Sequence, residues 1–134
     1  MMADKVTAME DTSVKPTIEV PAGDPPPELH MEDLVVGDGA ECSPGMIVNV
    51  DYVGVSWSTG KEFDASWNRN DVFSFALGGG QVIPGWDQGV AGMKVGGRRR
   101  LTIPPEMGYG AQGAGGVIGP NETLIFTVDL RGVG

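Results

Sequence analysis

The feature that most constrains the fold of this chain is a short helix embedded in a glycine-rich stretch, residues 78–110. Pro84 suits the first helical position, because its φ is already helical and its missing N–H would have had no partner there. Asp87 places a negative charge in the first turn, which a helix N-terminus favours. Gly89 and Gly92 limit the helix to about two turns, since glycine is about 1 kcal/mol worse than alanine inside a helix.

A helix of this length is unstable alone in water and must pack against another element. Trp86 lies near its start, and Val90 falls four residues later on the same face. We therefore expect Trp86 to anchor the helix on the rest of the fold.

The remaining chain has the pattern of short strands and turns, and 22 of its 134 residues are glycine. Alternating or β-branched runs predict strands at residues 29–36, 46–55, 62–64, 73–77, 98–103 and 123–130. Polar residues 66–71 indicate a bulge or loop. The sequence predicts an α+β fold, in which an antiparallel sheet of five or six strands wraps around the one short helix.

Negative charge is concentrated at the N-terminal end. Residues 1–45 carry ten acidic residues and two lysines, whereas residues 46–134 carry eight acidic and seven basic residues. Such a chain would repel a phosphate backbone, so we expect no nucleic-acid partner. Residues 1–27 are predicted to be an acidic, proline-rich and largely disordered tail, and residues 28–134 the folded domain. The tail is either a solvating leader or an arm that covers the core or binds a partner.

Several classes of site are excluded by composition. The single cysteine, Cys42, allows neither an internal disulfide nor a CxxC pattern, and the single histidine, His30, allows no multi-histidine metal site. We expect His30 to face solvent on a strand and Cys42 to be an ordinary turn residue, with no metal and no cofactor. Residues 1–11 lack the apolar core of a signal peptide, and no apolar run is long enough to span a membrane. A cytoplasmic protein without membrane contact is expected.

Two motifs resemble ligand-binding sites, but their sequence context argues against that function. Residues 108–113 match GxGxxG, but residues 114–120 cannot form the helix that a dinucleotide site requires. The basic run Arg98, Arg99 and Arg100 lies on a predicted strand, where side chains alternate between faces and make no compact phosphate clamp. A solvated sheet face is the interpretation we favour for this run.

The carboxylate of Asp64 and the nine aromatic residues are more informative. Asp64 follows Phe63 at the end of a hairpin arm; it is either an ordinary hairpin aspartate or a rim carboxylate, for which Arg69 is a plausible partner. Tyr109 stands between two glycines in a loop, where it has little core to join. An aromatic-walled pocket with one phenol at its lip explains this distribution better than core packing alone.

Five stretches in chain order resemble the FKBP-type peptidyl-prolyl cis–trans isomerases, the family that binds tacrolimus and rapamycin. They are VDYVG at 50–54, KEFDAS at 61–66, RNDVFSF at 69–75, the glycine-rich stretch at 78–110 and TLIFTVDL at 123–130. The resemblance covers about residues 28–134. It implies a ligand-binding pocket formed by Tyr52, Phe63, Asp64, Phe73, Val82, Ile83, Trp86, Tyr109, Ile118 and Phe126.

The resemblance also implies a role for each pocket residue. Trp86 would form the floor beneath a proline ring, and Asp64, Tyr109 and Trp86 would be the catalytic group. The Ile83 N–H and the Tyr109 hydroxyl would hydrogen-bond ligand carbonyls, while Asp64 would bind the ligand at the rim. The walls would be Tyr52, Phe63, Phe73 and Phe126.

Some positions depart from the family pattern. Asp51 and Pro84 stand where human members commonly have basic residues, and residues 114–116 are smaller than usual. The differences in the loop at residues 114–116 affect the expected affinity and sequence preference rather than the pocket. The implied function is isomerisation of Xaa-Pro bonds that assists protein folding, with proline-containing peptides, unfolded chains and macrolides as partners of a monomer. The alternatives are a non-catalytic proline-peptide binding module or a chaperone on the same fold.

Overall fold

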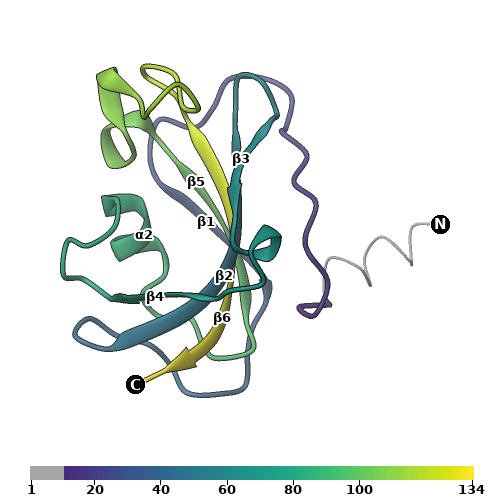
Figure 1. The fold of residues 1–134 in the computed structure, drawn as a ribbon, viewed down its shortest axis with the longest axis vertical. Coiled ribbons are helices and arrows are strands. Elements are labelled where there is room, and N and C mark those ends of the chain that lie inside the picture. Colours follow the sequence, from purple (N-terminus) through teal and green to yellow (C-terminus); the bar gives the residue numbers. More distant parts are fainter. Residues whose placement is uncertain (1–10) are drawn as a thin grey trace.

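Six antiparallel strands form one sheet in the computed structural model, which describes residues 11–134 (Figure 1). The order along the sheet is β1-β5-β6-β2-β3, and β4 pairs with the first half of β2. The predicted α+β architecture is confirmed. The strands are β1 (His30–Val35), β2 (Ile47–Ser56), β3 (Glu62–Ala65), β4 (Phe73–Ala76), β5 (Arg98–Ile103) and β6 (Leu124–Val133).

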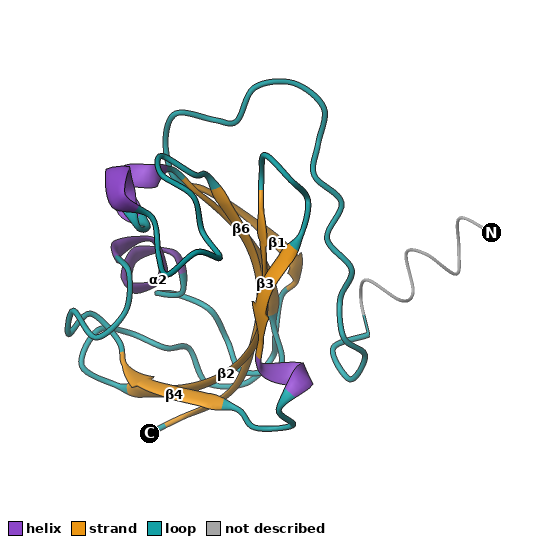
Figure 2. Ribbon diagram, turned by 45° about the horizontal axis from the view of Figure 1, so that its top comes forward, coloured by secondary structure: helices purple, strands orange, loops and turns teal. Residues whose placement is uncertain are grey.

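The predicted short helix is α2 (Pro84–Gly89), which lies on one side of the sheet (Figure 2). Trp86 and Val90 are buried, as their shared face predicts. A Cβ added at Gly85 would lie 2.5 Å from the Ile103 side chain, and one at Gly89 would lie 2.8 Å from Leu101. Only glycine therefore allows α2 to approach β5 this closely, so Gly89 is explained by packing as well as by helix length.

Three 3-10 turns complete the elements: η1 (Ser66–Asn68), η2 (Pro105–Met107) and η3 (Gly110–Gln112). The first falls within the predicted irregular segment after β3. The other two lie in the loop between β5 and β6, where the GxGxxG match is followed by no α-helix in the described residues. No helix of the described chain is long and apolar enough to cross a membrane.

Both faces of the sheet are buried over much of its central strands β2 and β6. The face under α2 holds the apolar core, including Val48, Val50, Leu101 and Val128. The opposite face is covered by an extended segment that we call the N-terminal arm, residues 11–20 (Figure 1).

Backbone carbonyls of the N-terminal arm bind the sheet directly. Arg98 Nη2 donates to the carbonyl of Val14 at 2.8 Å, and Arg131 Nη2 donates to that of Thr12 at 2.7 Å. Pro16 of the arm is buried. The assignment of residues 1–27 as a tail separate from the domain stays a prediction, and residues 1–10 lie outside the described residues.

The prediction of a solvated arginine face is wrong. Arg98 is fully buried and its Nε forms an ion pair with Asp129 Oδ1 at 2.6 Å. Arg99 is mostly buried, with its Nε 2.7 Å from Asp33 Oδ1. The sequence could not reveal these pairs, because Asp129 comes opposite Arg98 only through the register of β5 with β6. His30, by contrast, is exposed on β1 as predicted.

Candidate functional site

A cavity of about 500 Å³ opens beside α2 on the inner face of the sheet. Its lining includes every predicted ligand-binding residue except Ile118, which is buried in the core nearby. Sequence reasoning missed Gly80 and Gln81, which also line the cavity. The full lining is Tyr52, Phe63, Asp64, Phe73, Gly80, Gln81, Val82, Ile83, Trp86, Tyr109 and Phe126.

Trp86 lies at the centre of the aromatic cluster, buried except for a small part of its surface. Its ring centroid lies 4.9 Å from that of Tyr52 and 5.2 Å from that of Phe126, both in edge-to-face geometry. Phe75 and Phe73 follow at 5.6 and 5.9 Å. Edge-to-face contacts of this kind stabilise aromatic pairs beyond simple burial. The indole is therefore held by rings contributed from β2, β4 and β6.

Gly54 of β2 makes room for the second wall of the cavity. A Cβ at this position would lie 2.6 Å from the Phe126 ring and 2.7 Å from the Phe63 ring. The two rings meet edge to face across the glycine, with centroids 5.5 Å apart. A side chain at Gly54 would therefore push both rings toward the cavity.

A polar cluster of three residues stands at the rim. The Tyr52 hydroxyl donates to Asp64 Oδ2 at 2.6 Å. Arg69 donates from Nη1 to Asp64 Oδ1 at 2.7 Å and from Nη2 to the Tyr52 hydroxyl at 2.8 Å. The predicted partnership of Asp64 with Arg69 is confirmed, and the role of Tyr52 in it was not predicted. We call these three residues the rim cluster.

The rim cluster fixes the protonation of its members. Burial raises the pKa of Tyr52 to about 12, and the hydrogen bond to Asp64 contributes to the increase. Burial also pushes the pKa of Asp64 upward, but hydrogen bonds from Tyr52 and Arg69 outweigh it and hold that pKa below its ordinary value. At neutral pH, Asp64 is therefore a carboxylate and Tyr52 a phenol.

Tyr109 lies at the lip of the cavity, with 41% of its surface exposed. Burial of its inner part raises the pKa of its hydroxyl, and the charge of Asp64 acts in the same direction. The hydroxyl therefore stays protonated and can donate a hydrogen bond to a group that enters the cavity.

Comparison with known proteins supplies the family. A family model described as FKBP-type peptidyl-prolyl cis-trans isomerase matches residues 39–131. The chain belongs to this family. An FK506-binding protein of Streptomyces anulatus is 58% identical to this FKBP-type chain over 120 residues, which cover 89% of this chain and 97% of that protein. A probable FK506-binding protein of Corynebacterium glutamicum is 52% identical over 116 residues, covering 87% and 96%.

A solved structure agrees with the family assignment. The crystal structure of AtFKBP13 matches with a TM-score of 0.73 at 40% identity, and the match covers 79% of this chain and 93% of that one. The resemblance read from the sequence motifs is thus confirmed, and the FKBP-type chain belongs to an enzyme family of peptidyl-prolyl cis–trans isomerases.

The loop that enters α2 is held by two side chains of this FKBP-type chain. The Asp87 carboxylate accepts hydrogen bonds from the backbone N–H groups of Gly78 at 2.9 Å and Gly80 at 3.0 Å. Gln81 Oε1 accepts from the Ala76 N–H at 2.9 Å. These bonds fix the segment that leads to Val82 and Ile83. In the sequence Gln81 was only a polar loop residue, without a feature that marked it as part of the site.

Nucleophilic chemistry finds little support in this chain. Cys42 is buried, its thiol donates to the Val90 carbonyl at 3.1 Å, and burial raises its pKa. A thiol in this state is a poor nucleophile. Among the described residues, no group of three or more His, Cys, Asp or Glu side chains could hold a metal ion. The cavity instead offers apolar walls with a few polar groups at its edge, which suits binding and desolvation.

Proposed function

We propose that this chain catalyses cis–trans isomerisation of Xaa-Pro peptide bonds inside the aromatic cavity, and that it thereby assists the folding of other proteins. The observation that carries the proposal is the Trp86 indole, which lies within an open cavity and is surrounded by aromatic rings. A proline ring is small and apolar, so it can pack on an indole floor between such walls.

The reaction needs an environment that excludes water from the amide, and it needs no nucleophile. Rotation about a peptide C–N bond costs about 18–20 kcal/mol because resonance gives it double-bond character. Uncatalysed exchange of an Xaa-Pro bond takes tens to hundreds of seconds. The resonance form is charge-separated and is favoured by water at the carbonyl oxygen. Walls that exclude this water favour the twisted amide, and catalysis follows if the twisted state binds more tightly than either planar isomer.

Polar groups at the cavity edge orient the substrate. We assign the backbone N–H of Ile83 and the hydroxyl of Tyr109 to hydrogen bonds with substrate carbonyls, and Asp64 to a contact at the rim. Tyr109 supports this assignment because the residue is partly exposed at the lip of the cavity and its raised pKa keeps the hydroxyl protonated. With Trp86 as the floor, Asp64 and Tyr109 complete the proposed catalytic group.

The same cavity is proposed to bind FK506-type macrolides, proline-containing peptides and unfolded chains. Support comes from the two relatives described above, which are named as an FK506-binding protein and a probable FK506-binding protein. We also propose that the chain acts as a monomer.

The test is relaxation of a short Xaa-Pro peptide from cis to trans, with and without the protein and with added FK506. We expect acceleration that FK506 abolishes, and a several-fold lower kcat/KM for Tyr109→Phe and for Asp64→Ala. Asp71→Ala is the matched control, since Asp71 is exposed and does not line the cavity. It is expected to leave kcat/KM unchanged.

The other outcomes separate the alternatives. FK506 binding without acceleration would indicate a non-catalytic proline-peptide binding module, and absence of both would overturn the proposed cavity function. A chaperone with an inserted substrate-binding domain is disfavoured, because β2 joins β3 through residues 57–61 and β4 joins α2 through residues 77–83.

A further inference from the structure

One edge of β2 pairs with β6, and along the other edge the pairing strand changes in the middle of β2. β4 pairs with β2 as far as Val50, and β3 pairs with it from Val53 onward. Between these two points, the backbone N–H of Tyr52 donates to the hydroxyl of Ser66 at 2.8 Å. Ser66 is fully buried. One side chain therefore replaces a missing strand partner directly at a residue whose own side chain enters the cavity.

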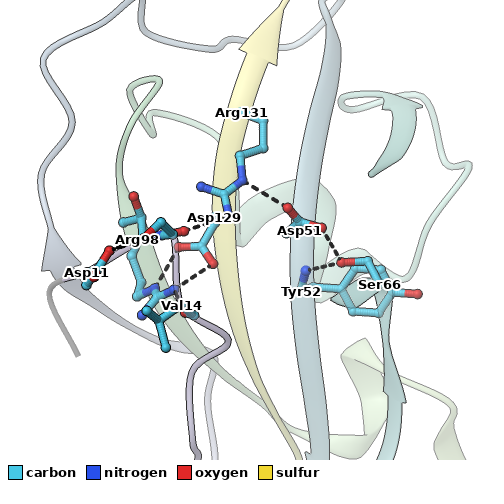
Figure 3. Close-up of polar contacts among 10 residues, drawn as sticks. Asp11, Val14, Asp51, Tyr52, Ser66, Arg98, Asp129 and Arg131 are labelled. Atoms are coloured by element: carbon cyan, nitrogen blue, oxygen red, sulfur yellow. Dashed lines mark hydrogen bonds and ion pairs between the residues drawn. The ribbon is translucent and has the colours of Figure 1, made fainter. Parts of the chain in front are cut away.

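Ser66 begins a chain of hydrogen bonds across the outer face of the sheet (Figure 3). Its hydroxyl donates to Asp51 Oδ1 at 2.7 Å, and Asp51 Oδ2 accepts from Arg131 Nε at 2.9 Å. Arg131 then donates from Nη2 to the Thr12 carbonyl of the N-terminal arm. Hydrogen bonds that involve charged groups are the stronger ones in proteins, so this chain is well suited to fix relative positions.

The N-terminal arm has a second anchor on the segment that carries the rim. Lys15 Nζ lies 2.9 Å from Glu62 Oε1 and donates to Asn68 Oδ1 at 3.1 Å. Asn68 Nδ2 donates to Glu62 Oε2 at 2.9 Å. Glu62 begins β3 and Asn68 ends η1. The arm therefore holds both ends of the segment that contains Asp64 and leads into Arg69.

We propose that Ser66, Asp51 and Arg131 are positioning residues for the isomerase site. They lie outside the cavity lining and act by fixing β2 against the β3–η1 segment, which keeps the rim cluster in its hydrogen-bonded geometry. The inference rests on the proposed function, in that the reaction takes place in this cavity. Two of the three rim hydrogen bonds join Tyr52 of β2 to Asp64 of β3 and to Arg69 after η1, so a shift between β2 and this segment would disturb both.

The main test is Ser66→Ala in the full chain, with kcat and KM measured on the Xaa-Pro peptide. Because small misplacements of catalytic groups are costly, we expect kcat/KM to fall about tenfold, mainly through kcat. Ser66→Thr keeps the hydroxyl and should restore most of the activity. Ser74→Ala is the matched control, since the exposed Ser74 hydroxyl donates to Asn49 of β2 away from the cavity. It should leave kcat/KM unchanged.

A spectroscopic readout distinguishes positioning from simple support of the fold. The chain has two tyrosines, so Tyr109→Phe leaves Tyr52 as the only one. In that background, the ¹³Cζ NMR shift of labelled Tyr52 reports its bonds to Asp64 and Arg69. We expect the signal to move in the Ser66→Ala variant and to stay unchanged in Ser74→Ala. If Ser66→Ala does not fold, Asp51→Asn is the second variant, because its amide has one acceptor oxygen and an NH₂ donor and cannot replace both carboxylate oxygens that accept from Ser66 and Arg131.

The outcomes are separable. An unchanged Tyr52 signal together with unchanged kcat/KM in a folded Ser66→Ala or Asp51→Asn variant would overturn the positioning role. Wild-type protein without isomerase activity would overturn the proposed function. In that case the Tyr52 signal alone still decides whether Ser66, Asp51 and Arg131 hold the rim cluster in place.

Discussion

The two faces of the sheet are buried by different means. The inner face is apolar, and α2 covers it incompletely, which leaves the cavity next to Trp86. The outer face buries the complete ion pair of Arg98 with Asp129 under an arm without regular secondary structure. Apolar side chains tolerate incomplete cover because they need no hydrogen-bond partners, whereas buried charges must be paired and hydrogen-bonded. The cavity accordingly lies on the face where incomplete cover costs least.

The outer face also shows how an irregular segment can become part of a fold. A guanidinium group has five N–H donors, and one carboxylate cannot satisfy them all. Carbonyls of Val14 and Thr12 take further donors of Arg98 and Arg131. The N-terminal arm thus supplies acceptors that the sheet lacks, so hydrogen bonds from charged groups add to the burial of Pro16 in attaching it. The following predictions test this difference.

The largest effect is expected from Asp129→Ala on the outer face. The substitution removes the carboxylate from a fully buried arginine, and breaking a buried pair in this way costs about 3–5 kcal/mol. Urea denaturation would measure the loss. The double variant Arg98→Met with Asp129→Leu should be far less destabilised, because it buries no charge. A loss below about 1 kcal/mol for Asp129→Ala would contradict the contrast between the faces.

On the inner face, Gly85→Ala is expected to have the next largest effect. The added methyl would lie 2.5 Å from Ile103, and overpacking of this kind typically costs about 1–3 kcal/mol. We also expect lower isomerase activity, since α2 carries Trp86. Gly119→Ala is the control, because a Cβ there has no neighbour within 4 Å among the described residues. Equal stability of the two variants would show that α2 can move away from β5.

Low pH should weaken the contribution of the rim cluster to stability. The pKa of Asp64 lies below its ordinary value in the folded chain, because the hydrogen bonds from Tyr52 and Arg69 outweigh burial. The contribution to stability is therefore complete above the unfolded pKa of about 3.9 and is lost as pH falls through the lower folded pKa. Unfolding free energies at about pH 6 and about pH 3 should differ more for wild type than for Asp64→Asn. Identical pH dependence in both proteins would rule out this linkage.

Lys15→Ala should have the smallest effect. The ion pair with Glu62 is partly exposed, and such pairs contribute less than about 1 kcal/mol. Lys15→Ala removes the partly exposed contact of the arm and leaves the buried ion pair of Arg98 with Asp129 intact, so it separates the two modes of attachment. Hydrogen exchange of the arm amides should become faster, while the exposed Lys61→Ala, one residue before β3, should leave it unchanged. A loss of several kcal/mol would mean that the arm is held mainly by this lysine.

Local patterns predicted much of the fold. Alternation and turn residues located all six strands, and only β6 extends well beyond its prediction, to Val133. The pairing of Asp64 with Arg69 was also predictable, because the two residues are close in the sequence. Gln81 and Ile118 show the limit for the site. Gln81 lines the cavity through a loop conformation that no local pattern encodes, and Ile118 packs into the core beside it.

The sequence by itself determined the short helix at Pro84, the inward Trp86 and the family motifs, since each depends on neighbouring residues or on their spacing. Tertiary structure alone decided that Arg98 is buried against Asp129 and that Gly85 and Gly89 allow α2 to pack closely on β5. It also decided that the N-terminal arm covers the outer face. The physical reason is distance along the chain. Burial and charge pairing depend on which remote segments the sheet register brings together, and that register is a property of the whole fold.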